Sequence, residues 1–168
     1  MVDVGGKRVT RRTAAARGVV AMARPAFEAL AEGRLAKGDA LAVARLAGIQ
    51  AAKQTAQLIP LCHTLGLSHV EVNLTSNQTS VEAICTARTT AQTGVEMEAL
   101  TGVTVALLTI YDMCKAVDKQ MKIGEIKLLM KTKTEARPNL SSRSGGARRA
   151  ATQAAQQTRP GLQTSKLK

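Results

Sequence analysis

Residues 68–88, SHVEVNLTSNQTSVEAICTAR, contain the pattern that most clearly predicts the fold of this chain. Apolar and polar residues alternate over 68–74 and again over 80–88, which is the period of a strand with one buried face. The polar segment TSNQT, residues 75–79, predicts a turn that joins the two strands into an antiparallel hairpin. Other elements must cover the buried face of this hairpin, because an apolar sheet face is unstable in water.

Helical patterns lie on both sides of the hairpin. On the N-terminal side, Pro25 opens a short helix that Gly33 ends, and Asp39 caps a longer helix that continues until Pro60. On the C-terminal side, residues 94–117 have the pattern of one long helix that is apolar on almost every face. We therefore expect the sheet to bury one side of this long helix and another subunit to bury the rest.

Two further strands complete the predicted sheet. Residues 16–23 and 121–131 have strand patterns, whereas residues 1–13 have the composition of an arm or loop. The element order is then β-α-α-β-β-α-β. This order predicts an α+β fold of the ferredoxin-like, split βαβ type, with an antiparallel sheet backed by helices.

The composition of the chain changes near residue 132. The 168 residues include 24 Lys and Arg against 12 Asp and Glu. Residues 133–168 hold eight of those cations and a single acid, Glu135, with little apolar periodicity. We predict one folded domain over residues 1–132 and a basic, disordered C-terminal tail over 133–168, because the tail has too little apolar surface to offset the entropy of ordering it.

The remaining composition limits the function classes. Cys62, Cys85 and Cys114 match neither a disulfide framework nor a paired metal motif, so we expect reduced thiols and no metal site. The chain shows no N-terminal signal pattern and no uncharged run of 18 residues, which predicts a soluble, cytoplasmic protein without a membrane partner. With two aromatic residues, it also lacks a stacking platform for nucleic acid.

Several cations lie beside predicted loops and helix ends, where an anionic ligand could bind. They are Arg11, Arg12, Lys37, Arg45, Lys53, Lys115 and Lys131. The chain has no Gly-rich phosphate loop, so side chains and helix termini would have to hold a phosphate. His63 lies in a loop between a helix and a strand, where a histidine can carry protons if the loop borders a cleft.

The long helix carries acids near both ends. Glu96 and Glu98 occupy its first turn, where the helix dipole favours carboxylates, and Asp112 can pair with Lys115 one turn away. Glu98 and Asp112 are separated by about 21 Å along a helix that rises 1.5 Å per residue. One small-molecule site cannot use both ends of one helix, so two functional ends would require a site shared between subunits.

Five segments together resemble one enzyme family. They are KGDALAVARLAGIQAAK (37–53), LIPLCH (58–63), LSHVEV (67–72), TGVEMEALT (93–101) and YDMCKAV (111–117). With the opening MVDV, they occur in the order found in cyclic pyranopterin monophosphate synthases of molybdenum cofactor biosynthesis, over residues 1–131. The resemblance implies a ferredoxin-like homohexamer, a trimer of dimers, with active sites at subunit interfaces. It also implies a lyase that rearranges 3′,8-cyclo-7,8-dihydro-GTP to the pyranopterin and releases pyrophosphate.

The resemblance also assigns residues to the site. The implied catalytic residues are Lys37, His63, Glu96, Glu98, Asp112 and Lys115. The implied substrate-binding residues are Arg12, Lys53, Cys62, Met97 and Lys131. No cofactor is required by this assignment, although Mg²⁺ can accompany the triphosphate of the substrate.

The chain departs from the family pattern at two places. Thr64 stands where the family commonly has proline after Cys-His, and Lys131 is followed by TKTEAR where the family often has a Gly-rich KSGGKSG-like segment. Two alternatives to the enzyme stay open. The basic charge suggests a nucleic-acid-binding protein, and the altered segment suggests a structural subunit that keeps the fold without the activity.

Overall fold

The computed structural model describes residues 1–135. Its elements are β1 (Thr10–Ala21), α1 (Arg24–Ala31), α2 (Ala40–Lys53), α3 (Thr55–Leu58), β2 (Leu67–Asn77), β3 (Ser80–Ala91), α4 (Glu96–Cys114) and β4 (Lys122–Glu135). Strand β4 continues three residues past the predicted domain boundary at 132. The rest of the predicted tail, residues 136–168, lies outside the described residues.

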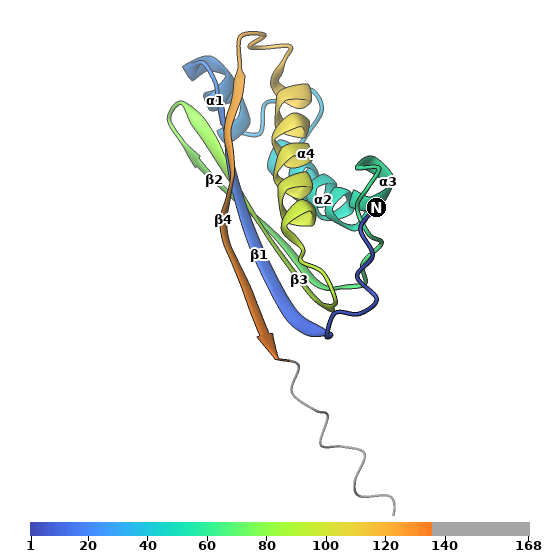
Figure 1. Cartoon of the computed structure of the whole chain (residues 1–168). Helices are drawn as coiled ribbons and strands as arrows, with labels where there is room; N and C mark the ends of the chain where they lie inside the picture. Colours follow the sequence, from blue (N-terminus) through green and yellow to red (C-terminus); the bar gives the residue numbers. More distant parts are fainter. Residues whose placement is uncertain (136–168) are drawn as a thin grey trace, which may run out of the picture. The chain divides into compact units, whose positions relative to one another are not determined.

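The four strands form one antiparallel sheet with the order β2-β3-β1-β4. β1 and β2 are parallel to each other and are separated by β3, which is the split βαβ arrangement predicted from the element order. Helices α2 and α4 cover one face of the sheet (Figure 1). The α+β prediction is therefore confirmed.

The β2–β3 hairpin forms where the alternating pattern places it. Its last pair is Asn77 with Ser80, and the Asn77 carboxamide oxygen accepts hydrogen bonds from the Ser80 hydroxyl at 2.9 Å and the Thr79 amide at 3.3 Å. Alternate residues of β3, among them Val81 and Cys85, are fully buried beneath the helices. The alternation and the polar turn thus set the register of this hairpin.

The largest errors in the predicted element boundaries are at the start of β1 and at the end of α2. β1 begins at Thr10, not at residue 16, because the polar segment from Thr10 onward pairs with β3 on one side and β4 on the other. α2 ends at Lys53, well before Pro60, and a separate short helix, α3, follows. The Thr55 hydroxyl marks this break, since it donates to the carbonyls of Ala51 at 3.3 Å and Ala52 at 3.0 Å.

Small residues allow the helices to approach the sheet and each other closely. A Cβ at Gly48 of α2 would lie 2.8 Å from the carbonyl oxygen of Gly102 in α4, and a Cβ at Gly18 of β1 would lie 2.7 Å from Leu107. α4 is the one helix in residues 1–135 that is long and apolar enough to cross a membrane. It packs against β1, β3 and α2 instead, with 56% of its most apolar window buried, as core helices do.

Candidate active site

A three-residue ion cluster lies at the C-terminal end of α4. Lys37 Nζ is 2.5 Å from Asp112 Oδ2, and Lys115 Nζ is 2.8 Å from Asp112 Oδ1. Lys37 also donates to the Asp112 carbonyl oxygen at 3.2 Å. These contacts lower the pKa of Asp112 to about 2, because the ammonium groups of Lys115 and Lys37 both stabilise its charged form, and Asp112 in turn raises the pKa of Lys115. The cluster therefore stays ionised and carries a net positive charge at neutral pH.

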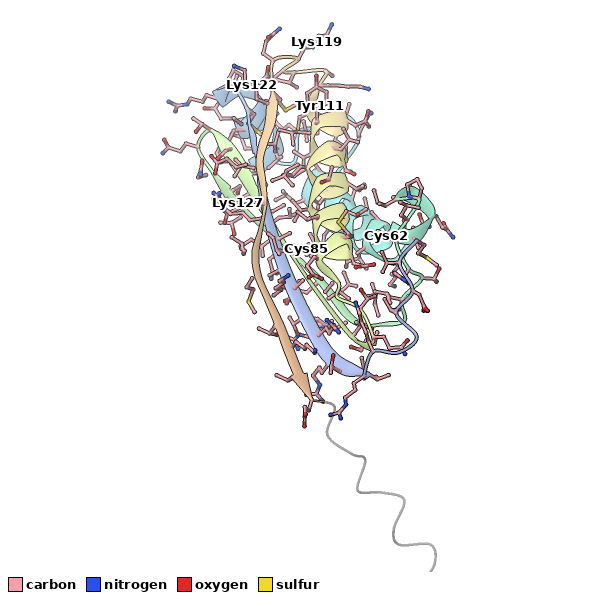
Figure 2. All side chains as sticks on the ribbon, in the orientation of Figure 1. Cys62, Cys85, Tyr111, Lys119, Lys122 and Lys127 are labelled. Atoms are coloured by element: carbon pink, nitrogen blue, oxygen red, sulfur yellow. The ribbon has the colours of Figure 1, made fainter. Side chains whose placement is uncertain are left out.

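An open cavity of about 410 Å³ borders this cluster. Tyr111 and Lys119 line it together with Lys37, Asp112 and Lys115. Figure 2 shows Tyr111 and Lys119 at this end of α4, away from Cys62, which lies beside α3. The Tyr111 hydroxyl donates to the Lys119 carbonyl at 3.3 Å and so holds the loop after α4 against the helix. The cations around this cavity make it suitable for an anionic group.

A second cavity, of about 220 Å³, lies at the N-terminal end of α4. Its walls include Cys62, His63, Glu96, Met97 and Glu98. The connector that follows α3 supplies the first two residues, and the first turn of α4 supplies the other three. The family motifs LCH and VEME are thus brought together in space, although they are more than 30 residues apart in the chain.

The two carboxylates at this end have different surroundings. Glu98 is 4% exposed, and its burial raises its pKa, with a smaller contribution in the same direction from the charge of Glu96. Glu96 is half-buried and lies 3.4 Å from Lys131 Nζ through its Oε1 atom. Burial and the charge of Glu98 raise the pKa of Cys62, so Cys62 remains a neutral thiol and is a poor nucleophile.

A third cavity, of about 280 Å³, continues from Glu96 toward the sheet. Arg12, Lys131 and Lys133 line it with Glu96. Lys133 is the strand partner of Arg12, because β4 stays paired with β1 through the segment that replaces the Gly-rich sequence of the family. Three cations thus face one cavity from two paired strands, and two of them, Arg12 and Lys131, were predicted to bind the substrate.

Lys53 lies apart from both groups. It lines a cavity of about 390 Å³ with His69 and residues of β2, at the side of α2. His69 itself is exposed on β2. Within the single chain, then, Lys53 does not join the residues with which it was grouped.

The predicted site residues therefore divide between the two ends of α4. Cys62, His63, Glu96, Met97 and Glu98, with Arg12 and Lys131 adjoining, lie at the N-terminal end. Lys37, Asp112 and Lys115 lie at the other end. Sequence reasoning did not identify Lys119 and Tyr111 as residues of the cavity beside Asp112. Lys119 follows the end of α4, so helix spacing could not place it there.

The order and spatial grouping of these motifs can be compared with known proteins. A sequence model of the MoaC family matches residues 1–134. The chain belongs to the MoaC family. The matched range, residues 1–134, includes the predicted site residues at both ends of α4.

Curated relatives in this family carry one name. The chain is 59% identical over 133 residues to a cyclic pyranopterin monophosphate synthase of Chloroflexus aggregans. This alignment covers 78% of this chain and 81% of the relative. Proteins of the same name from Heliobacterium modesticaldum and Pelotomaculum thermopropionicum are 57% and 54% identical. Each alignment covers 79% of this chain, and 84% and 79% of the respective relative. The family resemblance predicted from the motifs is confirmed.

Proposed function

We propose that this MoaC-family chain is a cyclic pyranopterin monophosphate synthase, the activity for which its relatives are named. Its substrate is 3′,8-cyclo-7,8-dihydro-GTP, and its products are cyclic pyranopterin monophosphate and pyrophosphate. The observation that carries the proposal is the convergence of Lys37, Asp112 and Lys115, which come from segments 75 residues apart in the chain and form one charged cluster. This is an enzyme of molybdenum cofactor biosynthesis and a lyase.

Cations at both ends of α4 suit the formation of a cyclic phosphate with release of pyrophosphate. Attack of a sugar hydroxyl on the α-phosphate forms the cyclic phosphate and expels pyrophosphate, so negative charge accumulates on the leaving group. Arg12, Lys131 and Lys133 surround one cavity, and Lys37, Lys115 and Lys119 surround another. Ammonium and guanidinium groups in these positions can stabilise the departing pyrophosphate.

The ring rearrangement needs groups that hold and release protons. Glu98 is suited to act as a proton donor, because its burial raises its pKa and so favours the protonated carboxyl group. Asp112 is suited to the opposite task, because its pKa is lowered and it raises the pKa of Lys115, which keeps that ammonium group charged. Its other carboxylate oxygen contacts Lys37. His63 lies in the same cavity as Glu98 and can carry protons between substrate atoms.

A complete site in this proposal combines two subunits. Glu98 and Asp112 lie near opposite ends of α4, about 21 Å apart at 1.5 Å per residue, which is farther than one small substrate can reach with its reacting atoms. An antiparallel approach of α4 from two copies would bring the N-terminal end of one helix toward the C-terminal end of the other. We propose a homohexamer built as a trimer of such dimers, located in the cytoplasm.

Purified full-length chain supplied with the cyclised dihydro-GTP intermediate tests the activity. We expect release of pyrophosphate together with the pterin product, and loss of both by at least about 100-fold in Lys115→Ala, because removal of one charge-stabilising group in an enzyme site costs on the order of 100-fold. Thr75→Ala, on exposed β2, is the control. A native chain that forms no product at any Mg²⁺ concentration would exclude the proposed function.

Subunit mixing tests the shared site. Glu98→Gln and Lys115→Ala proteins should each be inactive, but after subunit exchange some interfaces pair an intact N-terminal end with an intact C-terminal end. Activity should then partly return. Mass spectrometry of isotope-labelled subunits checks that exchange has occurred, and continued inactivity in exchanged assemblies would rule out shared sites.

We propose no resident cofactor, and Mg²⁺ enters with the triphosphate. Among residues 1–135, no group of three or more His, Cys, Asp and Glu side chains is placed to hold a metal ion. Mg²⁺ commonly keeps several water ligands and binds through substrate phosphates with one or two carboxylates, for which Glu96 is available beside the Lys131 cavity. Titration of Mg²⁺ against a fixed substrate concentration separates this role from that of a tightly bound ion.

A further inference from the structure

The N-terminal arm, residues 1–9, lies against the candidate active site. Figure 1 shows the N-terminus beside α3, with the arm descending from there to the start of β1. A turn within the arm is held by two hydrogen bonds, from the Lys7 amide to the Val4 carbonyl at 3.0 Å and from the Gly5 amide to Asp3 Oδ1 at 2.8 Å. The arm therefore has a defined local shape although it contains no helix or strand.

Two hydrogen bonds tie this arm to the rest of the fold. His63 Nε2 is 2.8 Å from the Val2 carbonyl oxygen, and Gln92 Nε2 donates to the Gly5 carbonyl oxygen at 3.0 Å. Gln92 is itself held in the loop between β3 and α4, because Arg12 Nη2 donates to its carbonyl oxygen at 2.9 Å. The contacts form a continuous path from Arg12 through Gln92 and the arm to His63.

The contact at Val2 determines which nitrogen of His63 carries the proton. A carbonyl oxygen can only accept a hydrogen bond, so His63 Nε2 must be the donor. In the neutral imidazole, Nδ1 then holds the lone pair and is the nitrogen that can take a proton. His63 borders the cavity of Glu96 and Glu98 and also the cavity lined by Val4 and Gln92, so the arm occupies one side of this imidazole.

We propose that Gln92 is a positioning residue that holds the N-terminal arm on His63, so that Nε2 remains protonated and Nδ1 is the basic atom presented to the substrate. The catalytic part of this statement rests on the proposed function, whereas the arm contact does not. Nδ1 takes a proton from the substrate and returns it at a later step, so His63 ends each turnover in its starting form. Gln92 acts only through the arm.

Nitrogen NMR of the full-length protein labelled with ¹⁵N-histidine tests the contact without any activity measurement. The chain has two histidines, so exposed His69 is an internal reference. Above the titration range of both rings, we expect His63 to be protonated at Nε2, with a slower exchange of that proton with water than in His69. In Gln92→Leu and in a deletion of residues 2–6, the slow exchange of His63 should be lost while the His69 signals stay unchanged.

The matched control is Gln78→Leu in the exposed turn between β2 and β3. It should leave both histidine signals as they are. Protonation of His63 at Nδ1 in the native chain would overturn the proposal, and so would slow exchange that persists in both arm variants. If Gln92→Leu disturbs folding, the His69 signals change with it, and the deletion of residues 2–6 then decides the question.

Kinetics test the catalytic consequence separately. Gln92→Leu should lower kcat about tenfold with KM within about twofold, because a misaligned proton carrier slows the chemical step more than it weakens binding. If Gln92→Leu alters the exchange of the His63 Nε2 proton but leaves kcat unchanged, the positioning role is overturned. The contact between the arm and His63 would then still stand. A native chain without activity but with the expected NMR signature would overturn the proposed function and leave the arm contact in place.

Discussion

At the residue scale, position in the fold gives two carboxylates opposite properties. Asp112 is half-exposed and contacts two ammonium groups, which lower its pKa to about 2, whereas Glu98 is buried and its pKa is raised. Spacing along the helix predicted the contact between Asp112 and Lys115. It could not predict the contact between Asp112 and Lys37, because the path of the chain between α1 and α2 decides where Lys37 lies.

The ion cluster predicts a specific pH dependence of stability. The pKa of Asp112 is lower in the folded state than its ordinary value of 3.8, so its contribution to stability is present above pH 4 and lost as the pH falls to about 2. Asp112→Asn should therefore have a lower urea midpoint than the native chain at pH 5, and this difference should disappear near pH 2. A difference that stays constant from pH 5 to pH 2 would contradict the assigned charge contacts.

His63 shows the same limit of sequence reasoning. Its place beside Glu98 follows from the family motifs, but its contact with Val2 joins residues 61 positions apart and left no local signal. Gln92 was missed for a related reason, since one glutamine in a loop has no pattern that distinguishes it. Contacts of this kind arise from the closed fold and not from periodicity.

At the element scale, alternation and helix punctuation were sufficient for most of the topology. The hairpin, the cap at Asp39 and the stop at Gly33 all occur as expected: Asp39 Oδ1 accepts from the Ala42 amide at 2.9 Å, and Gly33 has a φ of +67°. The start of β1 was missed because its first residues are polar, and pairing with two neighbouring strands outweighs their weak strand pattern.

The crossing of α2 and α4 predicts a large effect for a single added methyl group. Gly48→Ala should lower the free energy of unfolding by about 1–3 kcal/mol, because its Cβ would lie 2.8 Å from the Gly102 backbone oxygen, which cannot rotate away. Denaturation with urea measures the change. Gly66→Ala is the matched control, since nothing lies within 4 Å of its added Cβ, and equal effects at both positions would show that the helices are not in tight contact.

At the scale of the whole molecule, the helical layer leaves apolar side chains in water. Leu46 on α2 is 59% exposed and Leu108 on α4 is 54% exposed, although both helices pack on the sheet with their other faces. The apolar character of α4 predicted burial on a second side, and assembly with another copy stays a prediction. The exposed leucines indicate where that contact would form.

Assembly can be tested at this surface. Leu108→Glu should dissociate the oligomer and lower activity by at least about tenfold, because an unpaired carboxylate is costly to bury and the proposed site needs two copies. Light scattering after size-exclusion chromatography gives the mass. Gln78→Glu, at the far turn of the hairpin, adds the same charge and should leave the mass unchanged; full assembly of Leu108→Glu would place the subunit contact elsewhere.

The distance between the two ends of α4 has a consequence for how this chain can diverge. Each inserted residue would rotate one end relative to the other by about 100° and move it about 1.5 Å along the axis. Glu98 and Asp112 would then no longer face the groups they meet at their own ends. Natural insertions and deletions should therefore accumulate in the hairpin turn and the connecting loops, while the 19-residue length of α4 is inherited unchanged.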